Sequence, residues 1–337
     1  MRISVAILLT LSAQGLCAEL SREATKKRAD ALVRQLGHPE WVKREQAIQD
    51  LIKLGEPSLP ALREALRSVK NDLEVLRRSR VAITKILKGL RTKNSLGMEM
   101  SHVPAGRFTM GSPQSEAGRR SDEVPHRVRI TEYFLLGKYE VTQTEFYKLM
   151  GFNPSGFWNF GEGKKRVPRA GKQRYPVENV TWFDALEFCN RLSKKDGYDC
   201  YYQLTNVKLK DKSIVGATVK IQGGNGYRLP TEAEWEHACR AGSSMPFYFG
   251  IRNTGKQSNI KASYRTGGYG TRYKAWKDLS KTTYIGRYPA NEWRLHDMLG
   301  NVAEWVQDYY SPLYYRASPK KDPTGPETGR HRVIRGG

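Results

Sequence analysis

The sequence of 337 residues lacks the short motifs that identify many enzyme classes. It has no His-Glu-x-x-His or Cys-x-x-Cys pair, no Gly-x-Ser-x-Gly turn and no Walker-type phosphate loop. The sequence therefore gives no motif evidence for a zinc site built from residues close together in the chain. It also gives none for a serine hydrolase or a P-loop kinase. No apolar run reaches the roughly 18 residues that a transmembrane segment needs. With 4 cysteines, the chain is no disulfide scaffold.

Composition and charge are those of a folded, strongly basic protein. Hydrophobic residues make up 39% of the chain and charged residues 27%, which suits a protein with an apolar core. The 57 Lys and Arg against 34 Asp and Glu leave a net charge of +23, spread along the chain. The positive electrostatic potential that this charge creates suits an anionic glycan or a cell-envelope polyanion as partner. No motif indicates binding to a specific nucleic acid.

Residues 1–18 have the pattern of a cleaved signal peptide. A positive start and a short apolar segment are followed by small residues that end at Ala18. We therefore expect a secreted or periplasmic protein. Cys17 also admits a lipoprotein anchor, which is less favoured because Leu16 occupies the preceding position, where a small residue is expected.

Residues 19–95 have the apolar spacing of amphipathic helices. The leucines that share one helix face are Leu59, Leu62 and Leu66. Trp41 is among the apolar residues that mark the helix before, and Leu73 is among those that mark the helix after. The run from Trp41 to Leu66 resembles one HEAT-type helical repeat, a unit that buries its apolar face against neighbours. A small helical spacer and a peptide-binding surface both remain open as its role.

After residue 95 the pattern changes to short strands, glycine- and proline-rich turns and a few helices, which predicts an α+β fold. Three helices are expected to begin with a Thr-x-x-acid capping box. The pairs are Thr142 with Glu145, Thr181 with Asp184, and Thr231 with Glu234. Residues 198–226 have the alternation of an inserted hairpin. A disulfide between Cys189 and Cys200 is left open, because sequence does not fix the separation of the two backbones.

The strongest cluster of polar residues lies in the segment 295–305. Asp297, Asn301 and Glu304 flank a tight turn at Gly300. Calcium prefers six to eight oxygen ligands, which carboxylates, amides and backbone carbonyls supply. The alternative is a turn that the same side chains hold together by hydrogen bonds.

A series of motifs across residues 96–337 resembles the formylglycine-generating enzyme (sulfatase-modifying factor) family. The motifs, in the family's order, lie at residues 97–112, 122–126, 138–142, 175–182, 227–236, 295–305 and 333–337. The resemblance implies a C-type-lectin-like fold of low regular secondary structure, preceded here by the small all-α region. The family's last core strands follow the segment 332–334, so we expect the domain to be truncated at its C-terminus.

The resemblance also implies a chemistry. In the family, two cysteines bind copper(I), and dioxygen activated there oxidises a cysteine in a sulfatase Cys-x-Pro-x-Arg segment to formylglycine. These cysteines directly follow an Arg-Gly-Gly motif, which here is residues 335–337. No residue of this sequence is therefore assigned a catalytic or cofactor-binding role, and copper is expected only with a further C-terminal segment. Ala303 also stands where catalytic members usually have tryptophan.

Structural calcium is the cofactor that the resemblance implies for the residues present. The positions that match one family site are Asp297, Gly300, Val302 and Glu304, of which Gly300 and Val302 act through backbone carbonyls. The positions that match a second site are Asn259, Ile260 and, by a loose alignment, Asp278. Bound calcium would chiefly order the surrounding loops.

Three hypotheses about function follow. The first is a secreted formylglycine-generating-enzyme-like protein, whose partner is a sulfatase polypeptide or another secreted protein. The second is a non-catalytic, calcium-stabilised, lectin-like module that binds a protein or a glycan. The third is a scaffolding role for the helical region.

Overall fold

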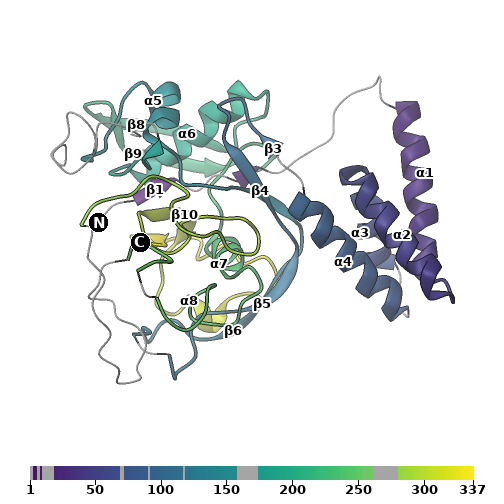
Figure 1. Cartoon of the computed structure of the whole chain (residues 1–337). Coiled ribbons are helices and arrows are strands. Elements are labelled where there is room, and N and C mark those ends of the chain that lie inside the picture. Colours follow the sequence, from purple (N-terminus) through teal and green to yellow (C-terminus); the bar gives the residue numbers. More distant parts are fainter. Residues whose placement is uncertain are drawn as a thin grey trace. The chain divides into compact units, whose positions relative to one another are not determined.

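The computed structural model describes residues 3–5, 8–9, 19–68, 72–89, 92–116, 118–157, 174–253, 255–260 and 280–337. These residues divide into two compact units, one of helices and one of mixed α/β structure (Figure 1). The predicted α+β class with little regular secondary structure is confirmed. No helix in the described part of the chain is both long and apolar enough to cross a membrane.

The helical unit contains α1 (Glu19–Gln35), α2 (Trp41–Leu54), the 3-10 helix η2 (Glu56–Ser58), α3 (Leu59–Ser68) and α4 (Leu73–Gly89). Leu59 and Leu62 are buried as predicted. Trp41 and Leu73 begin α2 and α4, the helices that they were expected to mark, and are 61% and 79% exposed. Each is the first residue of its helix, and helical side chains point toward the N-terminus, where no preceding turn covers them. The HEAT-type assignment stays a prediction.

The described strands of the mixed unit form four small sheets. One contains β1 (Ile3–Val5), β10 (Ala303–Tyr309) and β11 (Arg332–Arg335), and another contains β2 (Leu8–Leu9), β7 (Phe134–Gly137), β4 (Glu99–Val103) and β3 (Thr92–Lys93). The two-stranded sheets are β5 (Gly106–Met110) with β6 (His126–Ile130), and β8 (Tyr202–Lys210) with β9 (Ser213–Ile221). The last pair confirms the predicted hairpin. Strands β1 and β2 lie in the predicted signal segment, whose cleavage stays a prediction.

Four helices of the mixed unit are α5 (Gln143–Met150), α6 (Trp182–Lys195), α7 (Glu232–Arg240) and α8 (Tyr314–Ala317). The capping boxes that begin α5 and α7 are confirmed, with both hydrogen bonds present in each. At α6 the Thr181 hydroxyl accepts from the Asp184 N–H, but the Asp184 carboxylate accepts the Ile214 N–H at 2.8 Å. The third box is therefore incomplete, because that carboxylate attaches the hairpin to the helix instead.

Two large apolar clusters form most of the core among the described residues of the mixed unit. One surrounds α5 and α6 and includes the fully buried Phe146 and Phe188. The other lies between α7, β5, β6 and β10 and has Trp235 at its centre, 1% exposed. Loops that connect these elements carry the candidate site, and α7 and β10 supply its rigid supports.

The three described cysteines are free thiols. Cys189 is buried in the cluster around α6, whereas the Cys200 Sγ donates to the Asn190 carbonyl at 3.7 Å. The candidate disulfide between Cys189 and Cys200 is therefore not formed, since one thiol packs into the core and the other is bonded to the chain backbone.

The cap of α7 provides a local test of the fold. Thr231→Ala removes the hydroxyl that accepts the Glu234 N–H at 3.2 Å and is expected to destabilise the mixed unit by about 1 kcal/mol. Chemical denaturation monitored by tryptophan fluorescence measures the change. Thr231→Ser keeps the hydroxyl and serves as the control. Equal destabilisation by both substitutions would show that the cap is not the cause.

Candidate metal centre

The predicted metal-binding segment is a loop that leads into β10. Asp297, Gly300 and Asn301 adopt left-handed conformations with φ of 55°, 94° and 66°. Asp and Asn enter this region more readily than other side chains. Gly300 is required sterically, because a Cβ there would lie 2.7 Å from the backbone carbon and oxygen of Asn259. The loop conformation therefore depends on close contact with the segment 259–260.

Asn301 holds this loop to its surroundings. Its backbone N–H donates to the Asn259 carbonyl at 3.0 Å, and its side-chain oxygen accepts the Thr283 N–H at 2.7 Å. Its side-chain N–H donates to Glu140 at 2.6 Å. The amide oxygen that the sequence offered as a ligand is therefore already engaged by protein groups.

Three carboxylates are buried around the loop: Glu140, Asp297 and Glu304, which are 3%, 3% and 4% exposed. Glu304 accepts the Trp235 indole N–H at 2.7 Å. Asp297 accepts the Gly286 N–H at 2.7 Å through Oδ2, while its Oδ1 is buried with no hydrogen-bond partner among the described residues. Such a buried oxygen carries a desolvation cost that a bound cation would offset.

The pKa values of all three acids are raised. Burial is the largest cause in each, and it raises the pKa of Asp297 to about 6 and that of Glu304 to about 7. The negative charge of Asp297 contributes to the raised pKa of Glu304. Burial, followed by the charges of Asp297 and Glu304, holds the pKa of Glu140 well above its ordinary value. A bound divalent cation would favour the ionised carboxylates and so lower these raised pKa values.

The donors of this loop fit calcium by chemistry and burial. Asp297 and Glu304 would supply carboxylate oxygens, and Gly300 and Val302 would supply backbone carbonyls. Within the described ranges, no group of three or more His, Cys, Asp and Glu side chains could hold a metal ion by itself. A cation here would therefore depend on backbone oxygens as well as side chains.

The second predicted site lies against the first. Asn259 and Ile260 both contact the position that a Gly300 Cβ would occupy. The Asn259 side chain donates to the Lys281 carbonyl at 3.0 Å. Asp278, its predicted acidic ligand, lies outside the described residues.

Glu140 is the member of the cluster that the sequence alone did not identify. It lies in the motif segment 138–142 but 161 residues before its partner Asn301. Its Oε1 also accepts the Val302 N–H at 3.3 Å. Only the tertiary fold brings Glu140 to the loop. Its place in the family motif at residues 138–142 was therefore the sole sequence feature that singled it out.

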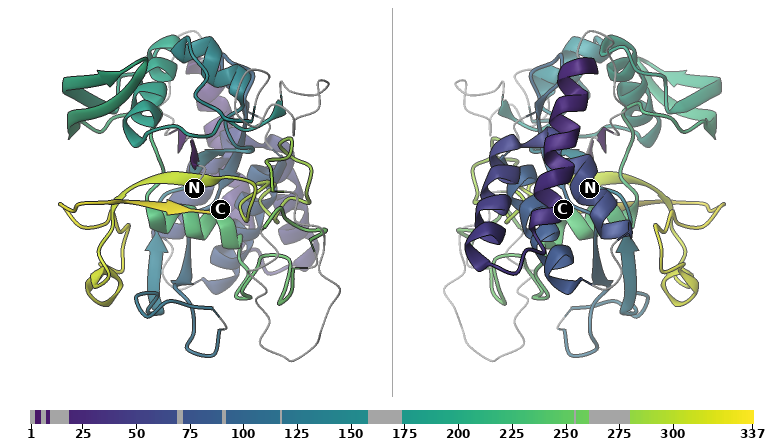
Figure 2. Two further views of the ribbon diagram at one scale, coloured as in Figure 1. Left: turned by 90° about the vertical axis from the view of Figure 1, so that its left-hand side faces the viewer. Right: turned by 90° about the vertical axis from the view of Figure 1, so that its right-hand side faces the viewer.

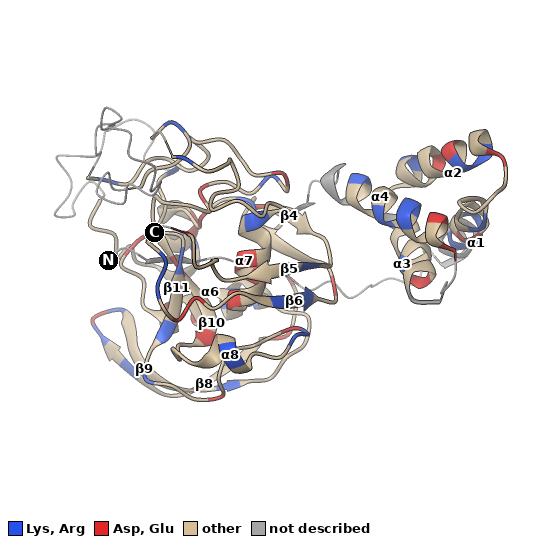
Figure 3. Ribbon diagram, turned by 90° about the horizontal axis from the view of Figure 1, so that it is seen from below, with Lys and Arg blue, Asp and Glu red and all other residues tan. Residues whose placement is uncertain are grey.

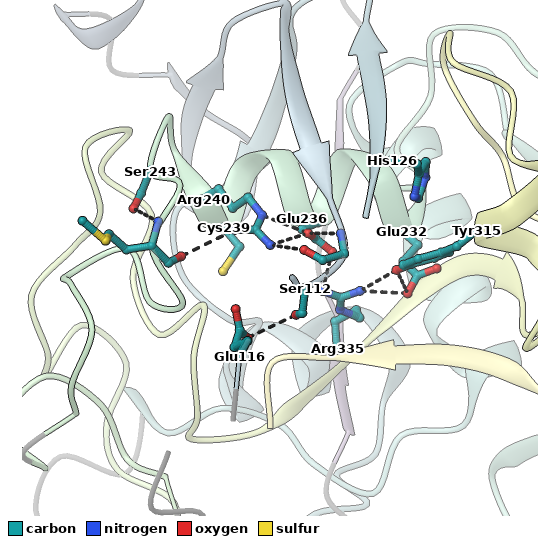
Figure 4. A network of polar contacts seen from close by, with 12 residues as sticks. Ser112, Glu116, His126, Glu232, Glu236, Cys239, Arg240, Ser243, Tyr315 and Arg335 are labelled. Atoms are coloured by element: carbon teal, nitrogen blue, oxygen red, sulfur yellow. Dashed lines mark hydrogen bonds and ion pairs between the residues drawn. The ribbon is translucent and has the colours of Figure 1, made fainter. Parts of the chain in front are cut away.

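A network of ion pairs joins α7 to Arg335 of β11 (Figure 4). Arg335 donates to Glu232 and to Glu236 at 2.8 Å each, and Arg240 donates to Glu236 at 2.9 Å. Burial would raise the pKa of Glu236, but the charges of Arg335 and Arg240 outweigh it and lower the pKa. The Arg335 guanidinium also lies 5.0 Å from the centre of the Trp235 ring, which connects the network to Glu304.

A cavity of about 1710 Å³ lies over this network. Its lining combines aromatic, charged and backbone groups, among them Trp235, Arg335 and the loop residues 301–303. The exposed apolar side chains of Met245 and Ile251 also line it. The cavity therefore places a mixed apolar and charged surface beside the candidate metal centre.

The described thiols do not fit a copper(I) site. Cys239 lines the cavity, but burial raises the pKa of its thiol to about 12. Burial likewise raises the pKa of Cys189 in the other core cluster. Copper(I) binds thiolates, and these environments favour the protonated form. No chemical step through copper follows from these residues.

A comparison with known protein families matches residues 89–337 to the sulfatase-modifying factor enzyme 1-like domain. The chain belongs to this family. The formylglycine-generating enzyme of Streptomyces coelicolor is 38% identical over 180 residues, which are 53% of this chain and 46% of that protein. The chaperone protein LppX of Paenibacillus barcinonensis is 36% identical over 194 residues, which are 53% of this chain and 63% of that protein. The chain thus spans less than two thirds of either relative.

A solved structure of the family fold supports the assignment. The variable protein 1 of Treponema denticola matches with a TM-score of 0.56 and 30% identity, over 74% of this chain and 87% of that one. The fold that the motif order implied is therefore confirmed.

Proposed function

We propose that this member of the family is a calcium-stabilised recognition module that holds a segment of another polypeptide in the cavity over α7. The observation that carries the proposal is the cavity itself. Its volume of about 1710 Å³ exceeds the roughly 300–1,000 Å³ of ordinary small-molecule pockets. The candidate partner is a sulfatase segment of the type Cys-x-Pro-x-Arg or another secreted polypeptide, and one relative carries the name of a chaperone.

The lining of the cavity suits a peptide. Met245 and Ile251 are 50% and 56% exposed and would be covered by a bound chain. Arg119 and Arg120 lie in the lining together with Asp122, so both signs of charge are available to backbone and side-chain groups. Buried apolar anchors surrounded by polar contacts are the usual composition of a binding interface.

Calcium and export belong to the same proposal. Calcium would hold the loop 295–304 in the conformation that borders the cavity, through the oxygens of Asp297 and Glu304. Extracellular modules work with calcium sites of modest affinity, which agrees with the proposed export through residues 1–18. Oxidation by copper and dioxygen is not part of the proposal for these residues, because the described thiols are buried or bonded to backbone.

A fluorescent peptide with a Cys-x-Pro-x-Arg segment tests the proposal by anisotropy in the presence of calcium. We expect saturable binding, and we expect Ile251→Asp to weaken it roughly tenfold, because a buried apolar contact is replaced by a charge. Leu313→Asp is the matched control, since Leu313 is 64% exposed and is not among the residues that line the cavity.

Each outcome of this experiment bears on the proposal. Equal loss in both variants, or no binding at all, would overturn it. Binding of an anionic glycan without peptide binding would favour the lectin-like alternative. Mass spectrometry of the peptide after incubation with copper and dioxygen is expected to show no oxidation to formylglycine.

A further inference from the structure

The hairpin β8–β9 is a two-stranded projection from the mixed unit (Figure 2). Each strand has nine residues, and every residue from 205 to 212 is exposed. The hairpin is attached to α6 near its turn through Ile214, which pairs with Leu209. The Ile214 N–H donates to Asp184 at 2.8 Å, and its carbonyl accepts from Thr181 at 2.7 Å. The tip, residues 205–212, is therefore exposed to solvent beside a position that α6 holds in place.

Aliphatic side chains occupy this tip without cover. Val207, Leu209 and Val215 are 45%, 64% and 48% exposed. The register pairs Leu209 with Ile214 and Lys208 with Gly216, so Leu209 and Val215 lie at neighbouring positions of the ladder. Single exposed aliphatic residues are ordinary, but three on the end of one narrow ribbon indicate a surface that is buried in another environment.

Lysines surround these aliphatic residues. Lys208, Lys210 and Lys212 stand at the tip with one acid, Asp211, and Figure 3 shows Lys and Arg along the hairpin. Their side chains are exposed, and no carboxylate of the described residues forms an ion pair with them. The tip thus combines an apolar surface with uncompensated positive charge.

We propose that the tip of the β8–β9 hairpin inserts into the headgroup region of an anionic lipid bilayer. Aliphatic side chains would enter the acyl boundary, while lysine stems lie along it and keep their ammonium groups at the anionic headgroups. A narrow convex ribbon fits a deformable lipid surface, whereas a specific protein interface needs about 1,000 Å² of complementary area. The net charge of +23 would add long-range attraction to the same surface. This inference does not depend on the function of the cavity.

Co-sedimentation with vesicles tests the inference on the full chain. We expect binding to phosphatidylcholine vesicles that contain phosphatidylserine and little binding to phosphatidylcholine alone. Lys208→Gln with Lys210→Gln is expected to lower the partition coefficient about 30-fold, since each lysine at an anionic surface contributes roughly fivefold. Leu209→Ser with Val207→Ser is expected to lower it about tenfold through loss of apolar insertion.

The control removes the same charge elsewhere. Lys320→Gln with Lys321→Gln changes exposed lysines in the segment after α8, an element far from the hairpin in Figure 1, and is expected to change binding less than threefold. Equal effects of the two lysine pairs would overturn insertion at the tip. So would binding to a soluble polyanion or an acidic protein with no binding to vesicles. Unchanged circular dichroism shows that each variant is folded.

Discussion

Without calcium, the ionisation of Asp297 and Glu304 is expected to destabilise the mixed α/β unit as the pH rises from about 4 to about 7. The folded pKa of Asp297 is raised from 3.8 to about 6, and that of Glu304 from 4.5 to about 7. A raised folded pKa means that the fold favours the protonated acid. The stabilisation is complete below the unfolded pKa near 4 and is lost as the pH passes through the folded values.

The size of the loss follows from the shifts. Each raised pKa corresponds to about 3 kcal/mol, and the two acids interact, so we expect a combined loss of at least about 3 kcal/mol. For a unit of this size that is a decrease of roughly 6–12 °C in the unfolding temperature. Thermal unfolding followed by tryptophan fluorescence in a chelator, near pH 4 and near pH 7, measures it.

Calcium is expected to cancel this decrease, because it binds the ionised carboxylates. A free concentration of about 100 times the dissociation constant would add about 2.7 kcal/mol near pH 7 and little near pH 4. Asp297→Asn with Glu304→Gln should remove the calcium response. Asp308→Asn is the control, because Asp308 is another buried acid with a raised pKa. It lies on β10 rather than in the loop, and its carboxylate accepts the Glu232 N–H at the start of α7. No shift with calcium in the parent protein would contradict the proposed site.

Replacing Glu236 with alanine is expected to destabilise the same unit by about 3 kcal/mol. The substitution removes one of the two carboxylates that Arg335 pairs with and the carboxylate that Arg240 pairs with. It also leaves the Gly111 N–H without its acceptor at 2.9 Å. Breaking a buried ion pair from one side costs about 3–5 kcal/mol. The lower figure applies because the Arg335 side chain retains 25% exposure.

Two further variants separate the causes. Glu236→Gln keeps an acceptor for the Gly111 N–H and should be less destabilising than Glu236→Ala. Glu187→Ala removes the partner of Arg191 in a pair on the surface of α6, 2.7 Å apart, and should change stability by less than about 0.5 kcal/mol. Chemical denaturation compares the three. A loss at Glu236 no larger than that at Glu187 would show that the network is not a structural support.

Much of the candidate site was predictable from sequence because it depends on one continuous loop. The spacing of Asp297, Gly300 and Glu304 identified a segment rich in oxygen donors, and the resemblance to the family favoured calcium there over an ordinary turn. The partners of that loop were not predictable. Glu140 and Trp235 reach it from elements far away in the chain, and neither has a local pattern that indicates the contact.

The amino-acid sequence by itself determined the helix starts at Thr142 and Thr231, a hairpin within residues 198–226 and the order of family motifs, because these depend on neighbours a few residues apart. Only the tertiary structure decided that the Asp184 carboxylate bonds Ile214, that Trp41 and Leu73 are exposed and that Cys189 and Cys200 remain free. It also decided that Glu140, Asp297 and Glu304 share one buried region. Burial and charge interactions arise only when segments more than a hundred residues apart are packed together, and these interactions set the raised pKa values on which the proposed calcium site depends.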